Sequence, residues 1–483
     1  MSPLALDRQV VRAKHPPIWT AYLTAKLKED GHRVDVLDLF REHQPESVIR
    51  QRLAAVAPDL VIVVAEEYDR KAPMAVSANL AQLARDVSPD ATIALMGTAE
   101  PGYYANIMRE NPVFDVGFVG EPDGVVPLWL SADESDYGGI RGLLWREGDE
   151  IRETGVAFMP DLDGLPAPDW DAVDAFSYQQ APHRRVGTTS YVMLASRSCP
   201  YRCSFCEELS YFKAVPVRLR SPRHVVDEMK AALRRNPMVE FSFQDAVFGM
   251  KSSWNKEFCG LLRAELPQAI WSVVTRSDAL DGAALVMMRE AGCYNVLIGV
   301  ESANEETLRF INKTNVNTTV VREFVANAHR AGMSVTASFV IGLPGEGRED
   351  IRRTVDFAID LEPDYAQFVV LKHFSGYRPY EDHGTYTTDW DFSDQDMLGP
   401  LFISSLFADK ADLRREQWRA YRRFYFHPRY LARKLPELLQ PSNLSRSFQA
   451  VRILGRMGLG ALSRSRARFQ HGSQTANATA VRK

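Results

Sequence analysis

Cysteine is scarce in this sequence, and long apolar runs are missing from it. The 483 residues contain five cysteines, and the first residues lack the apolar segment of a secretory signal. A disulfide-stabilised secreted protein is therefore not expected, and a reducing, cytoplasmic compartment is favoured. No uncharged apolar run reaches about 18 residues, so the sequence predicts no transmembrane helix.

An excess of one charge is also missing. The formal net charge is −4, with 45% hydrophobic and 25% charged residues. This is the composition of an ordinary globular protein, and without a basic excess no nucleic-acid partner is expected. The length of the chain predicts two or three domains.

Three of the five cysteines lie close together. Cys199, Cys203 and Cys206 occur in the stretch R-S-C-P-Y-R-C-S-F-C-E-E at residues 197–208, directly after an apolar run. A structural zinc site needs a fourth ligand, yet the other two cysteines are distant and no histidine lies near. An iron–sulfur cluster is the usual partner of closely spaced thiolates. With three local ligands, a 4Fe-4S cluster keeps one iron open.

Helical and strand patterns alternate in the N-terminal part, which we assign to a domain at residues 1–134. Helices are predicted at residues 18–29, 47–56 and 75–86, and strands at residues 32–39, 59–65, 91–96 and 113–119. Such βαβ units favour a doubly wound parallel sheet with a ligand crevice at the carboxyl ends of its strands. The candidate cofactor-binding residues at those ends are Gly97, Thr98, Gly120 and Glu121.

A linker rich in Pro, Gly and Asp follows at residues 135–185. Strand–helix units then fill a central domain at residues 186–385, with strands predicted at 190–195, 239–243, 270–274, 294–299, 335–341 and 366–371. These units predict a partial (β/α)6 barrel, whose active site forms at the carboxyl ends of the strands. Asp245, Arg276 and Glu301 follow such strand ends.

The spacing C-x-x-x-C-x-aromatic-C, with Phe205 as the aromatic residue, resembles the signature of the radical S-adenosylmethionine (SAM) enzymes. In that family the three cysteines hold a 4Fe-4S cluster whose fourth iron binds SAM. Electron transfer into bound SAM cleaves it and yields a deoxyadenosyl radical. The resemblance therefore implies a SAM-dependent radical reaction.

The same resemblance implies roles for residues around the barrel mouth. Phe205 is expected to contact the adenine of SAM. Asp245 and Arg276 are expected to contact its methionyl or ribose groups, and Glu301 its ribose or amino group. Gly342 and Pro344, in I-G-L-P-G-E, are expected to lie against the adenine.

The N-terminal domain resembles the cobalamin-binding domain that precedes the barrel in many radical SAM enzymes. The resemblance is carried by G-H-R-V-D-V-L-D at residues 31–38, P-D-L-V at 58–61, V-G-F-V-G-E-P at 116–122 and a proline-rich linker at 162–170. No D-x-H-x-x-G motif occurs, so a lower axial histidine is not expected. The usual first strand is missing before Pro16, which indicates a misplaced start codon or a trimmed domain. A domain that keeps the sheet but has lost cobalamin stays an alternative.

The last region, residues 386–483, is predicted to be helical with a basic tail. A helix is predicted at residues 413–426, and no acid follows Glu437. The arginines that flank apolar residues in the tail are Arg446, Arg452, Arg456, Arg464, Arg466 and Arg468. This basic amphipathic pattern suggests contact with a membrane surface or a partner, and a helical cap on the barrel mouth is the alternative. Residues 470–483 are predicted to be disordered.

The combined resemblance implies a cobalamin-dependent radical SAM enzyme that methylates an unactivated carbon of a small, hydrophobic, natural-product-like or lipid-like substrate. Oxidative cyclisation or rearrangement without methyl transfer is an alternative, as is a non-catalytic cobalamin-binding regulator. Cys259 and Cys293 are too few for a second cluster, which argues against methylthiotransferases. An external electron donor of flavodoxin or ferredoxin type is expected. His373, Tyr377 and Tyr380 are candidates for lining the substrate site.

Overall fold

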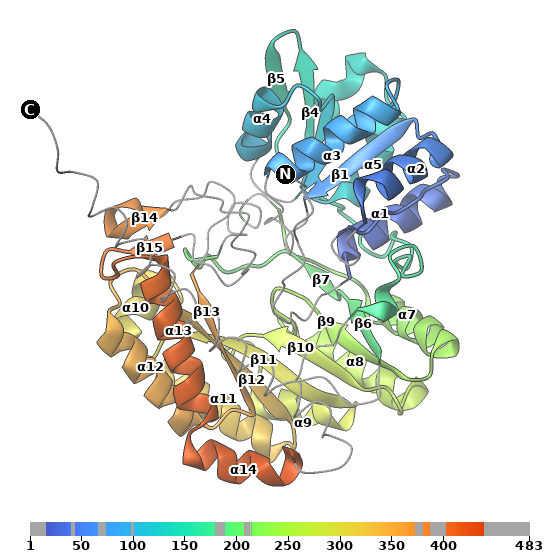
Figure 1. Ribbon diagram of the computed structural model, residues 1–483. Coiled ribbons are helices and arrows are strands. Elements are labelled where there is room, and N and C mark those ends of the chain that lie inside the picture. The colour runs from blue at the N-terminus through green and yellow to red at the C-terminus, as the bar shows by residue number, and fades with distance from the viewer. Residues whose placement is uncertain are drawn as a thin grey trace, which may run out of the picture.

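The computed structural model describes residues 16–39, 44–65, 74–97, 101–178, 189–206, 213, 215–371, 380–386 and 402–438. Within these residues the chain forms an N-terminal α/β domain, a barrel-like sheet and a C-terminal helical region (Figure 1). Several predicted features lie outside the described residues: Thr98, His373, Tyr377 and the arginine-rich tail beyond residue 438. No described helix is long and apolar enough to cross a membrane.

The N-terminal sheet has the predicted parallel core. Strands β1 (Leu60–Ala65), β2 (Thr92–Gly97) and β3 (Val116–Val119) pair in parallel, in that order. The helices are α2 (Glu46–Val56), α3 (Met74–Val87), α4 (Pro101–Glu110) and α5 (Pro122–Leu130), and a 3-10 helix covers Glu134–Gly139. Two apolar cores contain residues of this sheet, so the prediction of a doubly wound α/β arrangement is confirmed.

Two expectations for this domain differ from the structure. Residues 32–38 form no strand, because this segment is exposed or half-buried and joins none of the described sheets. The sheet also extends past residue 134, where we placed the domain boundary. Strands β4 (Leu143–Glu147) and β5 (Glu150–Glu153) form a hairpin that pairs antiparallel with β3. Buried Leu143 and Leu144 explain this, because they pack into the cores of the N-terminal domain.

Helix α1 (Ile18–Glu29) forms over the predicted range and belongs to two cores at once. Its buried Ile18 and Tyr22 pack into the large core of the barrel. Its buried Leu23 and Leu27 pack with residues of the N-terminal sheet and α5. The helix therefore connects the two domains through apolar contacts.

The central domain is an open half-barrel of parallel strands, as predicted. Its sheet contains β6 (Thr189–Met193), β9 (Val239–Phe243), β10 (Trp271–Thr275), β11 (Cys293–Glu301), β12 (Ser334–Ile341) and β13 (Tyr365–Val370), adjacent in chain order. The helices are α7 (Pro222–Arg235), α8 (Ser252–Glu265), α9 (Gly282–Glu290), α10 (Glu305–Phe310), α11 (Thr318–Arg330) and α12 (Arg348–Leu361). A short 3-10 helix, Ala175–Ser177, precedes β6. The side chain of Ser221 caps α7 by accepting a hydrogen bond from the backbone N–H of His224, and Pro222 follows it, as its sequence predicts.

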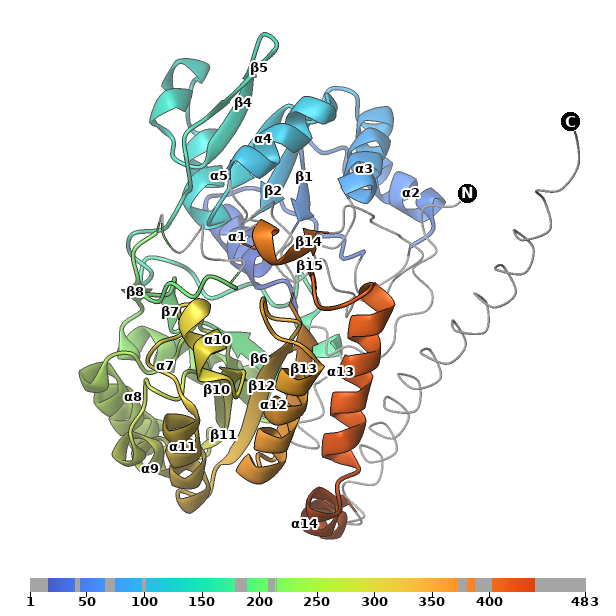
Figure 2. The same ribbon diagram turned by 90° about the vertical axis from the view of Figure 1, so that its left-hand side faces the viewer.

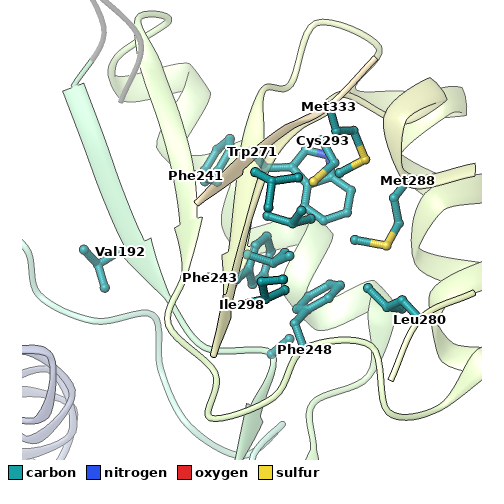
Figure 3. Close-up of a cluster of buried hydrophobic side chains, with 14 of the residues drawn as sticks. Val192, Phe241, Phe243, Phe248, Trp271, Leu280, Met288, Cys293, Ile298 and Met333 are labelled. Atoms are coloured by element: carbon teal, nitrogen blue, oxygen red, sulfur yellow. The ribbon is translucent and has the colours of Figure 1, made fainter. Parts of the chain in front are cut away.

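Aromatic side chains fill the barrel core between the sheet and its helices (Figure 3). Phe243 and Trp271, on neighbouring strands, meet edge to face with 5.8 Å between ring centroids. The Trp271 indole donates a hydrogen bond of 2.8 Å to the carbonyl of Ala291, so its polar atom is satisfied inside the core. Tight packing of this kind keeps the strand ends in fixed positions.

The C-terminal region covers the side edge of the half-barrel. It contains the 3-10 helix Glu381–His383, strands β14 (Gly384–Tyr386) and β15 (Phe402–Ser404), and helices α13 (Lys410–Tyr425) and α14 (Pro428–Leu438). Along β13, the Tyr425 hydroxyl accepts from the N–H of Ala366 and donates to its carbonyl. The Tyr421 hydroxyl accepts from Phe368 N–H, and Gln417 donates to the Phe368 carbonyl. Side chains of α13 thus bind edge groups that a further strand would otherwise pair.

Candidate active site

The cysteine-bearing loop starts from a short strand at the carboxyl end of β6. Strand β7 (Ser196–Arg197) pairs antiparallel with β8 (Arg218–Leu219). Both figures of the whole chain place β7 between the N-terminal domain and the barrel (Figures 1 and 2). Ser198 then adopts a left-handed conformation, with φ of 74°, and its hydroxyl donates a hydrogen bond of 2.8 Å to the Val215 carbonyl. This turn leads directly into Cys199.

The three cysteines of the loop form no disulfide bonds, so each can supply a thiolate. Cys203 is buried, whereas Cys199 and Cys206 are half-buried, and burial raises the pKa of the Cys199 thiol. Within the described ranges, no three His, Cys, Asp or Glu side chains converge as ligands of a single metal ion. A cluster differs from such a site because each cysteine binds a different iron. Three closely spaced cysteines that each bind one iron are a usual ligand set for a 4Fe-4S cluster.

Contacts with distant segments hold the loop in place. The N–H of Ser204 donates to the Ile311 carbonyl at 2.9 Å, and the Ser204 hydroxyl lies 2.8 Å from the Tyr380 hydroxyl. The Asn312 amide donates a hydrogen bond of 2.7 Å to the Arg202 carbonyl. Tyr380 was a candidate for lining the substrate site, and here it supports the segment between Cys203 and Cys206.

Arg276, which follows β10, lies against a cysteine of the loop. Its Nη1 donates to the Sγ of Cys203 at 3.5 Å, and its guanidinium lies 3.7 Å from the ring centroid of Tyr201. Asp278 binds the other side of the guanidinium through two contacts of 2.9 Å. This arrangement places a fixed positive charge beside a predicted cluster ligand.

Asp245, which follows β9, binds the chain that leads to the loop. Its carboxylate accepts from the N–H of Ala195 at 3.1 Å and from the hydroxyl of Ser196. Burial raises the pKa of Asp245 to about 6. The described contacts of Asp245 therefore fix the junction of β6 and β7.

Glu301 and Phe205 meet through a lysine that the sequence did not single out. Glu301 ends β11 in a left-handed conformation, with φ of 65°, and its Oε1 lies 2.6 Å from Nζ of Lys313. Lys313 also donates to the Gly299 carbonyl at 2.8 Å and lies 5.9 Å from the Phe205 ring centroid. A lone lysine after a short helix carries no motif, so only the fold could reveal this pair.

The I-G-L-P-G-E segment closes the next strand end. Gly342 has φ of 85°, a left-handed conformation that favours glycine, and a Cβ there would lie 2.9 Å from a methyl carbon of Leu413 in α13. Pro344 is buried beside it. Glu346 is also buried and accepts a hydrogen bond from the Ser302 hydroxyl, and burial raises its pKa to about 7.

The candidate residues of the N-terminal sheet have different surroundings. Gly97 ends β2, paired with Ala65 of β1 and Val119 of β3, at the edge where a crevice was predicted. Gly120 instead forms a bridge with Ala157, and a Cβ on Gly120 would lie 2.4 Å from the Ala157 carbonyl oxygen. Glu121 is fully buried and binds arginines of the central domain.

Comparisons with known proteins agree with this geometry. Residues 193–358 match the family described as the Radical SAM superfamily. The chain is 26% identical over 380 residues to an uncharacterized methyltransferase of Pyrococcus horikoshii, an alignment that covers 77% of this chain and 80% of the relative. It is 26% identical over 432 residues to the anaerobic magnesium-protoporphyrin IX monomethyl ester cyclase of Rubrivivax gelatinosus, covering 86% and 75%.

A solved structure extends the likeness to both domains. The cobalamin-dependent SAM radical enzyme OxsB, with aqua-cobalamin and SAM bound, superposes with a TM-score of 0.66 at 13% identity, covering 92% of this chain and 69% of that chain. The family match includes all three cysteines of the loop, and the structural likeness includes the sheet in front of the barrel. Residues 193–358 therefore form a radical SAM domain, and the chain has the fold of cobalamin-dependent radical SAM enzymes.

Proposed function

We propose that this protein is a cobalamin-dependent radical SAM C-methyltransferase that acts on a small, hydrophobic molecule. The observation that carries the proposal is the position of the cysteine loop. It leaves the carboxyl end of the barrel sheet and is joined through Arg197 to Glu121, directly after the last parallel strand of the N-terminal sheet. A cofactor at each of these two strand-end regions would face the same space between the domains.

Different residues of the barrel mouth would bind the cluster and SAM. Cys199, Cys203 and Cys206 supply the thiolates for the cluster. Arg276 donates to Cys203 and neutralises negative charge there, and the Lys313–Glu301 pair lies beside Phe205, where the adenosyl part of SAM would bind. Gly342 and Pro344 provide a close-packed backbone surface for the adenine, and we assign Asp245 to the support of β7.

The N-terminal sheet is the proposed cobalamin site, with Gly97 and Thr98 at its carboxyl edge. Bound together, the cluster, SAM and cobalamin supply an electron, a hydrogen-abstracting radical and a transferable methyl group. The protein's own residues hold these groups and exclude water. We further propose a cytoplasmic enzyme reduced by a flavodoxin-like or ferredoxin-like donor, and a basic tail that contacts a membrane surface.

Oxidative cyclisation is the second candidate reaction. The specific observation in its favour is the likeness to a relative named as a cyclase, which covers 86% of this chain. Both reactions start with hydrogen abstraction, so the residues of the barrel mouth would serve either one. Only the fate of the substrate radical separates them.

The test uses the full chain, reconstituted anaerobically with iron, sulfide and hydroxocobalamin. Iron analysis should give about four irons per chain, and the cobalamin absorbance should stay with the protein after desalting. Reactions with methyl-deuterated SAM and candidate substrates, followed by mass spectrometry, should place a deuterated methyl group on carbon. Cobalamin that washes off would remove the methyl-transfer proposal, and a product with a new ring and no added methyl group would establish cyclisation.

A further inference from the structure

Four buried charged side chains join the N-terminal domain to the cysteine loop. We call them the interdomain ion network: Glu121, Asp123, Arg197 and Arg218. Nη1 of Arg197 lies 2.9 Å from Oε2 of Glu121 and 2.7 Å from Oδ2 of Asp123. Nη2 of Arg218 lies 2.6 Å from Oε1 of Glu121. The side chains of both acids are 0% exposed, and that of Arg197 is 3% exposed.

The burial of this network is costly, which points to a role other than stability. Removing charges from water costs several kcal/mol per ion, and a well-packed apolar group is often as stable. The Oδ1 of Asp123 and the Nη2 of Arg197 have no hydrogen-bond partner among the described residues. Arg197 also lies over the rings of Trp19 and Tyr22 in α1, with 4.6 and 5.0 Å to their centroids. Its guanidinium is therefore held from two sides by the N-terminal part of the chain.

The network is connected to the first cluster cysteine by a short, constrained stretch of backbone. Arg197 and Arg218 are directly paired residues of β7 and β8. Only Ser198 separates Arg197 from Cys199, and its left-handed turn is tied down by its bond to Val215. A shift of the Arg197 side chain thus moves β7 and, with it, Cys199.

We propose that Glu121 and Asp123 are positioning residues for the iron–sulfur cluster. The N-terminal domain holds Arg197 and Arg218 through these two acids, and so sets the place of Cys199 at the barrel mouth. The inference rests on the cluster part of the proposed function and is independent of cobalamin and of methyl transfer. It also gives Glu121, which follows the sheet's carboxyl edge, a role other than cofactor binding.

The experiment compares Glu121→Gln and Asp123→Asn with a matched control in the full reconstituted chain. The control is Asp364→Asn at the opposite, amino end of the barrel, where the Asp364 carboxylate binds Lys434 at 3.0 Å and accepts from Val335 N–H at 2.9 Å. In each variant, the network variants and the control alike, an amide replaces a partly or fully buried carboxylate that binds a cationic side chain. The readouts are the thermal midpoint, the iron content, and the EPR spectrum of the reduced cluster with and without SAM. The rate of uncoupled SAM cleavage is measured as well.

We expect both network variants to change the SAM-dependent shift of the EPR signal and to lower SAM cleavage about 10- to 100-fold, the usual cost of losing a group that supports metal ligands. Asp364→Asn should lower the thermal midpoint and leave the spectrum unchanged. Network variants that lose thermal stability like the control but keep the wild-type spectrum and cleavage rate would overturn the proposal. If Glu121→Gln does not fold, Asp123→Asn decides, because it leaves both contacts of Glu121 to arginine in place. A wild-type protein without a cluster would instead contradict the proposed function.

Discussion

At the carboxyl end of the barrel sheet, the buried side chains include ionisable groups: Asp245, Arg276, Glu301, Lys313 and Glu346. In the interior of the same domain, a cluster of buried side chains is apolar and aromatic (Figure 3). The surroundings of the cysteines differ in the same way. Cys203 has a guanidinium within hydrogen-bond reach, whereas Cys293 lies among residues such as Trp271 and Met333 (Figure 3).

The difference shows how one fold uses burial for two purposes. In the interior, burial removes apolar area from water and stabilises the sheet. Burial raises the pKa of the Cys259 thiol to about 12 there, so this thiol stays neutral in the apolar core. At the strand ends, loops supply charged partners, so that buried groups keep polar contacts and can face a cofactor.

The largest expected effect tests this division among the cysteines. Cys203→Ala should lose the cluster and all SAM cleavage, because only two thiolates of the loop remain. Cys259→Ala, which changes a fully buried core cysteine, should retain both. Iron analysis and chromatography of 5'-deoxyadenosine measure the two outcomes. Full cluster content in Cys203→Ala, or loss of the cluster in Cys259→Ala, would contradict the assignment of Cys203 to the cluster and of Cys259 to the core.

Sequence patterns predicted those parts of the fold that depend on residues close together in the sequence. The six strands of the half-barrel and the cysteine loop follow from short apolar runs and from the spacing of Cys199, Cys203 and Cys206. Strand ends were predicted well enough to bring Asp245 and Arg276 to the same edge. The predicted strand at residues 32–39 was wrong because local alternation does not ensure a partner strand.

Pairings between distant residues could not be predicted in the same way. Glu121 and Arg197 are 76 residues apart, and Arg276 and Cys203 are 73 apart. From the sequence alone, a glutamate after a strand is equally compatible with binding a cofactor and with forming an ion pair. The choice depends on which domain lies opposite, and that is a property of tertiary packing.

The second prediction compares two buried carboxyl groups at opposite ends of the barrel. Burial raises the pKa of Glu346 from 4.5 to about 7. Burial also disfavours ionisation of Asp364, but the hydrogen bond from His329 and the charge of Lys434 outweigh it and lower the pKa of Asp364. Glu346 therefore stabilises the fold in its protonated form, and Asp364 in its ionised form.

As pH rises through the window between 4.5 and about 7, the unfolded chain releases the Glu346 proton while the folded chain keeps it. The free energy of unfolding should therefore fall with pH relative to Glu346→Gln, by roughly 3 to 4 kcal/mol at most, since one pKa unit is worth about 1.4 kcal/mol. For Asp364 the sign is opposite: relative to Asp364→Asn, the free energy of unfolding of the wild type should rise with pH, in the more acidic range. Urea denaturation at about pH 5 and about pH 8 measures the Glu346 difference. Parallel curves for wild type and Glu346→Gln would contradict the raised pKa.

The smallest expected effect concerns the side edge of the sheet, away from the strand ends. In Tyr425→Phe the N–H and carbonyl of Ala366 both lose their partner, at 3.1 and 2.8 Å. Leaving such groups buried and unpaired should cost about 2 kcal/mol of unfolding free energy. Because β13 keeps its pairing with β12, the strand end and the cluster loop should not move, and SAM cleavage at low temperature should equal that of wild type. A loss of cleavage without a loss of stability would show that the edge and the carboxyl end are coupled, since α13 also carries Leu413 against Gly342.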